Sequence, residues 1–330
     1  GFTSTGDVPE GQGEGSSKPT ETRTVQFPGG SVFEGEVNER TGEPEGFGTC
    51  RFANGDRYSG SWRAGQPHGK GVYLWSTGSS FDGHFRDGTP HGKGTKTYSG
   101  GGWYNGDWFN GAESGSGSCE YLNGDRYDGN FREGLPNGQG AMRYPDESKY
   151  TGEFFNGKPH GEGVFVLPSG QVQFEGDWLN GLPKHGRHKF SNGDVYTGAW
   201  HSGKMHGHGV YLKANGSWFE GEFRHGQPHG HGVYSRVTGG GFEGRVEAGE
   251  PHGEGTSELS CGSKYKGSFV AGKRHGYGVM TGEQGDSYTG TWAGGKAHGQ
   301  GVLALSDGCV CEGSFQAGQA HGPGRLRTGT

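Results

Sequence analysis

The hydrophobic residues of this chain follow one recurring pattern, in which an aromatic residue is followed by any residue and then by glycine. The copies begin at Phe33, Tyr58, Phe81, Tyr104, Tyr127, Tyr150, Phe174, Tyr196, Phe219, Phe242, Tyr265 and Tyr288, and Cys311 replaces the aromatic in the thirteenth copy. Most steps are about 23 residues, while the first is longer and the two steps around Phe174 are irregular. A fixed period of about this length predicts an array of one supersecondary unit whose neighbours bury each other's hydrophobic faces.

Within a copy the pattern predicts a β-hairpin. Tyr58, Gly60 and Trp62 lie two residues apart, so an extended strand places all three on one face. A break at 64–65 and a second strand-forming run over 69–75 follow, and several copies then carry Asn-Gly or Asp-Gly, a strong hairpin signal. Two strands and two turns occupy the whole repeat, which leaves no room for a helix.

A second hydrophobic row lies four residues after the first, with Val37 and Val246 replacing the aromatic in two copies. Glycine repeated at fixed strand positions indicates that another group packs closely against the backbone there. We expect that group to be an aromatic ring lying over the glycine of a neighbouring strand. We therefore predict a thin structural aromatic spine, with no catalytic or ligand-stacking role. Its members are Tyr58, Trp62, Phe81, Phe85, Tyr104, Trp108, Tyr127, Phe131, Tyr150, Phe154, Phe174, Trp178, Tyr196, Trp200, Phe219, Phe223, Tyr265, Phe269, Tyr288 and Trp292.

Composition supports an ordered chain without one deep core. Glycine accounts for 76 of 330 residues and hydrophobic residues for 27%, well below the share of about 45–50% in compact domains. The aromatic content of 12% argues against disorder. An elongated, twisted, single-layer antiparallel sheet of consecutive hairpins satisfies both observations.

Net charge and cysteine content limit the partners and the cellular compartment that we expect for the protein. The net charge of −6 argues against nucleic-acid binding, which requires a basic face. Five cysteines at irregular positions predict reduced thiols rather than a disulfide framework, and hence a cytoplasmic protein. We find no apolar run of about 20 residues and no signal-peptide core.

The histidines do not predict a metal site, and no motif predicts catalysis. Ten copies carry His-Gly after the first turn, but equivalent positions in successive hairpins are about 9–10 Å apart, too far to share zinc. The Gly-x-Gly motif recurs throughout the chain as part of the hairpins. No glycine-rich stretch ends in Gly-Lys-Ser/Thr, as a phosphate-binding loop would. We expect no enzyme activity, no cofactor and no metal.

The combined motif resembles the membrane occupation and recognition nexus (MORN) repeat. It is present as the segments 58–71 and 288–301, which share the aromatic, the second-row tryptophan and the His-Gly-x-Gly element. The resemblance covers a thirteen-copy array at 25–327, preceded by a flexible N-terminal tail at 1–24 and followed by a C-terminal end at 328–330. It implies the all-β sheet of hairpins described above, and a non-enzymatic function.

The family resemblance implies a structural scaffold for protein–protein interaction in a cytoskeletal assembly, with a cilium or flagellum axoneme and a radial-spoke-like role favoured. Other proteins of that assembly are the expected partners, and open sheet edges allow self-association. An alternative is a peripheral membrane protein that tethers partners at a lipid surface, which the acidic balance disfavours. A third is a glycan-binding array, which the His-Gly-x-Gly element disfavours.

The copies also depart from the pattern. Glu45, Ser114 and Asn137 replace the histidine, and the segment 183–188 is interpreted as lacking the second glycine of its copy. A bend near 180–190 is one hypothesis for this segment, and a tolerated loop variation is the other.

Overall fold

The computed structural model describes residues 20–329, and every regular element in this range is a β-strand. The chain divides into two compact units, unit 1 ending at Asn137 and unit 2 beginning at Gly138. The division does not coincide with the segment 180–190, where a bend was one hypothesis.

The strands of unit 1 are β1 (Thr20–Gln26), β2 (Val32–Asn38), β3 (Pro44–Arg51), β4 (Arg57–Arg63), β5 (Gln66–Leu74), β6 (Ser80–Arg86), β7 (Thr89–Thr97), β8 (Trp103–Phe109), β9 (Ala112–Glu120) and β10 (Arg126–Arg132). The boundary between the units falls inside β11 (Leu135–Arg143).

The strands of unit 2 are β12 (Lys149–Phe155), β13 (Lys158–Val166), β14 (Val172–Leu179), β15 (Leu182–Lys189), β16 (Val195–His201), β17 (Lys204–Leu212), β18 (Trp218–Arg224), β19 (Gln227–Ser235), β20 (Gly241–Glu247), β21 (Glu250–Glu258), β22 (Lys264–Val270), β23 (Lys273–Thr281), β24 (Ser287–Ala293), β25 (Lys296–Ala304), β26 (Val310–Gln316) and β27 (Gln319–Arg327).

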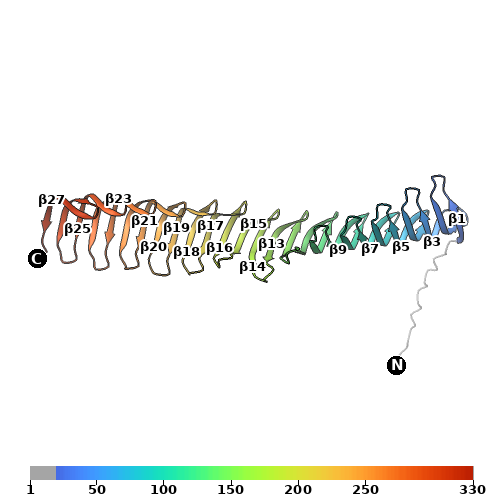
Figure 1. The fold of residues 1–330 in the computed structure, drawn as a ribbon, viewed down its shortest axis with the longest axis horizontal. Coiled ribbons are helices and arrows are strands. Elements are labelled where there is room, and N and C mark those ends of the chain that lie inside the picture. The colour runs from blue at the N-terminus through green and yellow to red at the C-terminus, as the bar shows by residue number, and fades with distance from the viewer. Residues whose placement is uncertain (1–19, 330) are drawn as a thin grey trace, which may run out of the picture. The chain divides into compact units, whose positions relative to one another are not determined.

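Within each unit every strand pairs antiparallel with the strand that follows it, as in β3–β4–β5 and β16–β17–β18. Figure 1 shows the strands of unit 2 following one another in chain order. This arrangement confirms the predicted all-β architecture of consecutive antiparallel hairpins.

The hairpin β16–β17 shows how one copy folds. Gly198 faces Gly209 across the pair, and Trp200 then faces Met205, so β17 contains two residues more than β16 between these pairings. The extra residues form a bulge, and Gly207 adopts a φ of 61° there, a conformation that favours glycine. The bulge belongs to the second strand, which therefore begins three residues earlier than the sequence indicated in the equivalent hairpin β4–β5.

The two turns of a repeat also differ from the prediction. The turn after the first strand has positive φ at both central residues, as in Ala64 and Gly65. This is the type I′ geometry that suits a two-residue hairpin. In the Asn54-Gly55 turn only the glycine has positive φ, and the amide of Phe52 donates to the carbonyl of Asp56 at 2.9 Å. The Asn-Gly pair thus closes a longer loop.

The copy that begins at Phe174 requires a correction. Gly186 pairs with Gly176, as the second glycine does in the other copies, so the second glycine is present. The bulge between the pairings Asp177–His185 and Trp178–Pro183 holds a single extra residue, Lys184. The missing residue is the bulge glycine, and His185 is therefore not equivalent to the histidines of the other copies.

The predicted tail at 1–24 overlaps the described structure. Residues 20–24 belong to β1, which pairs with β2 over seven residues. Residues 1–19 and 330 lie outside the described range, so the predictions of a flexible tail and of a separate C-terminal end remain predictions for those positions.

Candidate binding surface along the aromatic spine

The aromatics that begin the copies, here called the marker aromatics, lie over a glycine of the next strand. That glycine pairs with the glycine two residues after the marker, as Gly209 pairs with Gly198 after Tyr196. A Cβ added to Gly209 would be 2.4 Å from the hydroxyl oxygen of Tyr196, and one added to Gly278 would be 2.3 Å from that of Tyr265. Real Cβ atoms do not approach other atoms so closely, so only glycine fits beneath the ring. The Tyr196 hydroxyl donates to the carbonyl of Ala199 at 3.0 Å, which fixes the ring, and burial raises its pKa to about 12.

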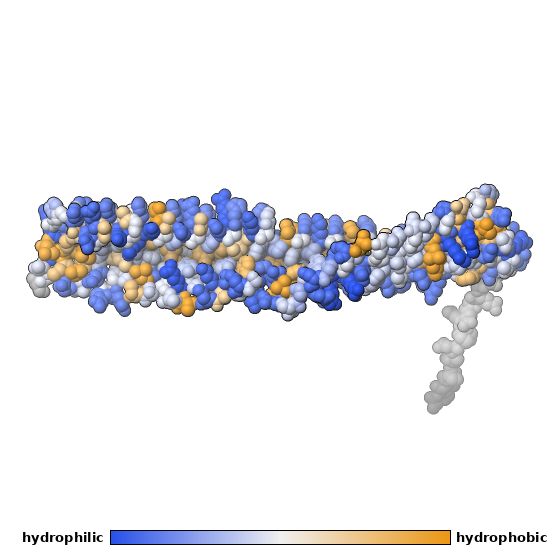
Figure 2. Space-filling view, viewed as in Figure 1, coloured by the Kyte–Doolittle hydropathy of each residue, from blue (hydrophilic) through white to orange (hydrophobic). Residues whose placement is uncertain are grey.

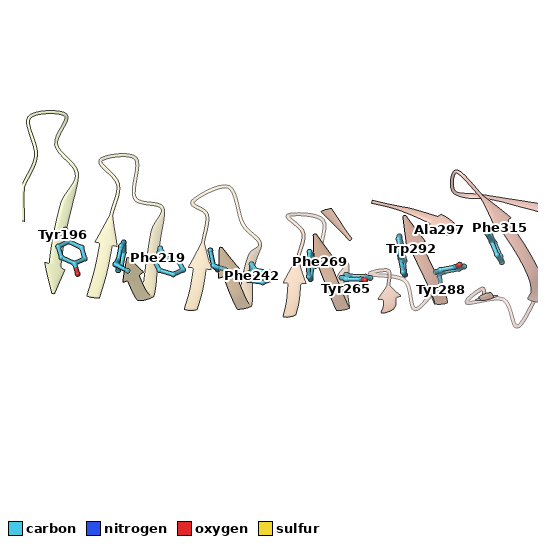
Figure 3. Packing of buried hydrophobic residues seen from close by; sticks show 11 residues of the cluster. Tyr196, Phe219, Phe242, Tyr265, Phe269, Tyr288, Trp292, Ala297 and Phe315 are labelled. Atoms are coloured by element: carbon cyan, nitrogen blue, oxygen red, sulfur yellow. The ribbon is translucent and has the colours of Figure 1, made fainter. Parts of the chain in front are cut away.

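Where both second-row positions are aromatic, a marker ring contacts two second-row rings, one from its own strand and one from the next hairpin. The centroid of Tyr265 lies 5.1 Å from that of Phe269 and 5.2 Å from that of Trp292, both in edge-to-face geometry. Tyr288 repeats the arrangement with Trp292 at 5.1 Å. Such contacts add about 0.5–1.5 kcal/mol per pair beyond the buried area. Figure 3 shows these rings in a row along the hairpins of unit 2.

The second-row tryptophans tie one hairpin to the preceding one by a hydrogen bond. The Nε1 atom of Trp292 donates to the carbonyl of Gly278 at 3.2 Å, and that of Trp178 donates to Gly163 at 3.2 Å. Trp200 is the exception, because its buried Nε1 has no acceptor in the described part of the chain. The hairpin before Trp200 is the short one at β14–β15.

All predicted spine residues are buried except Trp200, which is partly exposed. Each of the two predicted rows is interrupted once in unit 2. Val246 replaces an aromatic in the second row, and Cys311 replaces one in the marker row. Gly324 has no ring over it, because its nearest neighbours are only backbone atoms of Glu312 and Gly313.

A third row of side chains, which was not predicted from the sequence, lies on the same face. Its members lie directly opposite the marker aromatics, as Tyr211 lies opposite Tyr196 and Met280 opposite Tyr265. The row was traceable as the position two residues after the second glycine. Its chemistry varies from copy to copy, and its residues are Cys50, Tyr73, Lys96, Cys119, Met142, Phe165, His188, Tyr211, Tyr234, Ser257, Met280, Leu303 and Leu326.

A groove of about 800 Å³ runs along the spine of unit 2, from Met205 in β17 to Arg274 in β23. Its floor contains second- and third-row side chains, and its margins contain charged residues such as Lys213 and Glu250. In the view of Figure 2, the C-terminal part of the molecule has a band of hydrophobic and near-neutral residues between hydrophilic margins. An extended chain fits such a surface better than a compact substrate does.

Unit 1 has a smaller hollow of about 240 Å³ on its own spine. The Tyr98 hydroxyl donates to the Glu113 carboxylate there, and burial together with this bond raises the pKa of Tyr98. The ammonium of Lys96 lies 4.9 Å from the Tyr98 ring and 5.3 Å from the Trp75 ring. The protein's own side chains therefore occupy this region.

Aspartates at the Asn-Gly turns connect successive hairpins at one margin. Asp194 accepts hydrogen bonds from the Tyr211 hydroxyl at 2.5 Å and from the amide of Ala214, in the next turn, at 2.8 Å. These bonds, that from Tyr211 first, lower the pKa of Asp194. Asp56 makes the equivalent contacts in unit 1 and its pKa is also lowered.

The repeat histidine of a regular copy lies at the bulge, as His206 does beside Gly207, whereas His188 is a third-row residue on the spine face. The His206 ring contacts His201 at a centroid distance of 5.4 Å and His225 at 6.5 Å. No group of three metal-ligating side chains is placed to hold an ion within residues 20–329. In the same range no helix is long and apolar enough to cross a membrane. The five cysteines are free thiols, of which Cys50 and Cys119 are buried.

The fold and this surface define a β-hairpin repeat protein whose side-chain rows recur from copy to copy. The chain belongs to the MORN repeat family, whose model matches residues 41–57, 58–80, 81–103, 104–126, 127–149, 150–172, 174–195, 196–218, 219–241, 242–259, 265–287, 288–310 and 311–329. These thirteen matches confirm the predicted repeat family and copy number. MORN repeats are generally non-enzymatic modules that interact with proteins or membranes.

No curated protein sequence matches the chain. Among solved structures, the TCP domain of SAS-4 from Drosophila melanogaster, in complex with a proline-rich motif of Ana2, is 13% identical with a TM-score of 0.30. That match covers 51% of this chain and 95% of the TCP domain. The TCP10 domain of CPAP from Danio rerio is 11% identical over 88% of this chain and 94% of the domain, with a TM-score of 0.16. Similarity at this level gives no information on function.

Proposed function

We propose that the chain is a non-enzymatic scaffold that binds partner proteins along its sheet in a cytoskeletal assembly, with a ciliary or axonemal, radial-spoke-like location. The observation that carries the proposal is the repetition of the surface. Third-row side chains, most of them partly exposed, recur at one register beside the buried marker and second-row side chains, so the repeats present rows of contact positions. Rows of this kind suit extended partners.

Self-association at the sheet edges is part of the same proposal. Among residues 20–329, β1 pairs on one side only, with β2, and β27 on one side only, with β26. An edge strand presents unpaired amide and carbonyl groups that a further strand can pair with. Sedimentation of the purified chain at rising concentration tests this, and a monomer at every concentration would contradict it.

The test of the scaffold is proximity labelling with the tagged chain in ciliated cells. We expect labelled axonemal proteins, and retention of the chain on detergent-extracted axonemes. Labelling confined to membrane proteins, with full extraction by detergent, would overturn the cytoskeletal location.

A membrane-tethering function is the second candidate. In unit 2 the last residue of several first strands is an exposed hydrophobic side chain on the face away from the spine, with Phe155, Leu179 and Val270 between 45% and 49% exposed. Sedimentation with vesicles of phosphatidylcholine and phosphatidylserine at physiological salt tests it. Binding lost in a Phe155→Ser, Val270→Ser variant would support this function.

A further inference from the structure

The spine of unit 2 is hollow at the hairpin β20–β21. Its second-row residue is Val246, where the hairpins on either side have Phe223 and Phe269. Its third-row residue is Ser257, where the preceding hairpin has Tyr234. Both replacements are smaller by most of an aromatic ring, and they occur in the same copy.

The strand register places the small residues among glycine and proline. Val246 faces Pro251 on one side and Gly230 on the other, so neither neighbour fills the space of the absent ring. Ser257 faces Phe242 on one side and Tyr265 on the other, and Phe242 and Phe269 line the groove beside it. Val246 and Ser257 both line the groove of about 800 Å³, at a place where other copies have aromatic side chains.

Two arginines lie along the same groove. The guanidinium of Arg274 lies 4.5 Å from the Trp292 ring centroid and donates to the carbonyl of Gly295 at 2.8 Å. Burial lowers the pKa of Arg274. Arg236 lies 5.4 Å from the Tyr234 ring centroid. Within the described range neither arginine forms an ion pair with a carboxylate, so a carboxylate from a partner meets no competitor.

The charge of the groove is opposite to that of the chain. Its lining contains four cations and two carboxylates, namely Lys213, Arg236, Lys273, Arg274, Glu250 and Glu258. The Glu258 carboxylate is already paired with Lys264 at 3.6 Å. Because the chain as a whole has a net charge of −6, this local excess of positive charge favours an acidic ligand.

We propose that this groove binds an extended, acidic peptide segment of a partner protein. One large apolar side chain of the peptide fills the hollow over Val246 and Ser257, and a carboxylate nearby pairs with Arg274. The groove crosses β17 to β23, or about 29 Å at the usual strand spacing, which accommodates about nine extended residues. The inference rests on the proposed scaffold function and specifies the class of partner.

The observations favour a peptide over a lipid surface. The site is a recess lined by apolar and aromatic side chains, which a single side chain of an extended peptide can enter more readily than a layer of lipid headgroups can. Aromatic and arginine side chains in a recess are the groups that anchor peptide side chains.

A random twelve-residue peptide library displayed on phage, selected on the full chain, is the probe. We expect the selected peptides to combine Trp, Phe or Leu with Asp or Glu. Binding of a synthetic selected peptide should weaken at least about tenfold in Val246→Phe, which fills the hollow, and about tenfold in Arg274→Gln, which removes the charge. Val233→Phe is the matched control, because the same change lies on the opposite face, and its affinity should equal that of the wild type.

The results of these experiments distinguish the groove proposal from the scaffold function and from membrane binding. If Val246→Phe unfolds, Ser257→Trp fills the same hollow from the neighbouring strand and should cause the same loss. Selected peptides without acidic residues, or with affinity unchanged in both filling variants, would overturn the groove proposal. Binding to phosphatidylserine vesicles that Arg274→Gln abolishes, without peptide selection, would assign the groove to a membrane instead. Axonemal proximity labelling that persists in Val246→Phe would leave the scaffold function standing while the groove proposal fails.

Discussion

The hairpins β14–β15 and β22–β23 have the same fold but connect differently to the hairpin that follows. In β22–β23 the bulge contains Gly276, and the carbonyl of Gly278 accepts the indole hydrogen bond of Trp292. In β14–β15 the bulge is one residue shorter, and the indole N–H of Trp200 in the next hairpin has no acceptor. The bulge therefore determines how well one copy is joined to the next.

The ring contacts differ in the same direction. The centroid distance from a marker ring to the second-row ring of the next hairpin is 5.2 Å for Tyr265 and Trp292, but 6.1 Å for Phe174 and Trp200. His188 lies beside both rings, at a centroid distance of 5.3 Å from Trp200 and 6.4 Å from Phe174, and burial lowers its pKa. A weaker junction is therefore predicted after β15, and the following changes test it.

The largest effect is expected from filling the space beneath a ring in a regular hairpin. Gly209→Ala would put a Cβ 2.4 Å from the Tyr196 hydroxyl oxygen, and we expect a loss of about 3 kcal/mol in the free energy of unfolding. Urea denaturation measures it. Gly282→Ala is the control, since its added Cβ meets nothing closer than 3.6 Å. Equal losses in the two variants would show that glycine is needed only for backbone freedom.

Removing the indole N–H should separate the two junctions. Trp292→Phe loses the bond to Gly278, and we expect it to be about 1 kcal/mol more destabilising than Trp200→Phe, which loses no such bond. Hydrogen exchange should rise mainly in the adjacent hairpins, because array energetics are dominated by neighbours. Equal effects of the two substitutions would contradict the difference between the junctions.

Restoring the bulge should strengthen the weak junction. A glycine inserted between Lys184 and His185 returns β14–β15 to regular length, and we expect a gain of about 1 kcal/mol as Trp200 acquires its acceptor. The gain should be absent when the same insertion is combined with Trp200→Phe. A gain that survives the double change would assign the effect to turn flexibility.

The smallest effect concerns acid stability. The pKa of Asp194 is lowered in the folded protein, so its contribution is present above the unfolded carboxyl pKa of about 3.9 and is lost as pH falls through the lower folded value. Gln171 occupies the same turn position before β14 and has no such titration. Unfolding free energies measured from pH 7 to pH 2.5 should therefore fall less at acid pH in Asp194→Asn. Parallel pH profiles for the variant and the wild type would exclude the contribution.

Much of the fold followed from the sequence because one physical constraint repeats. An aromatic two residues before a glycine fixes which face is buried, and glycine pairing then fixes the register, as with Tyr196, Gly198 and Gly209. Counting residues along one copy gave the wrong assignment where a single glycine could be either the first or the second glycine of the His-Gly-x-Gly element. Gly186 appeared to be the first glycine of its copy because it follows a histidine, and only the strand pairing identifies it as the second.

The binding surface was less predictable. The third row escaped the sequence analysis because its residues share a position and no chemistry, as Lys96, Ser257 and Met280 illustrate. The hollow at Val246 was recorded as a missing aromatic, but its depth depends on Gly230 and Pro251, which neighbouring strands bring beside it. Such neighbours become visible only when the register is known. The ciliary location and the partners remain proposals.

The paired glycines also determine how the molecule can change in length. In a hairpin with a marker aromatic, a strand that slipped by one residue would bring a Cβ atom beneath the ring, so the contact keeps the two strands in register. Insertions within a copy are absorbed at the turns, as in the long loop between β2 and β3, and do not propagate. Whole copies can then be added or removed without disturbing the rest, each changing the sheet by two strands, or about 9.6 Å. The glycine–ring contact thus preserves the strand register when the number of repeats changes.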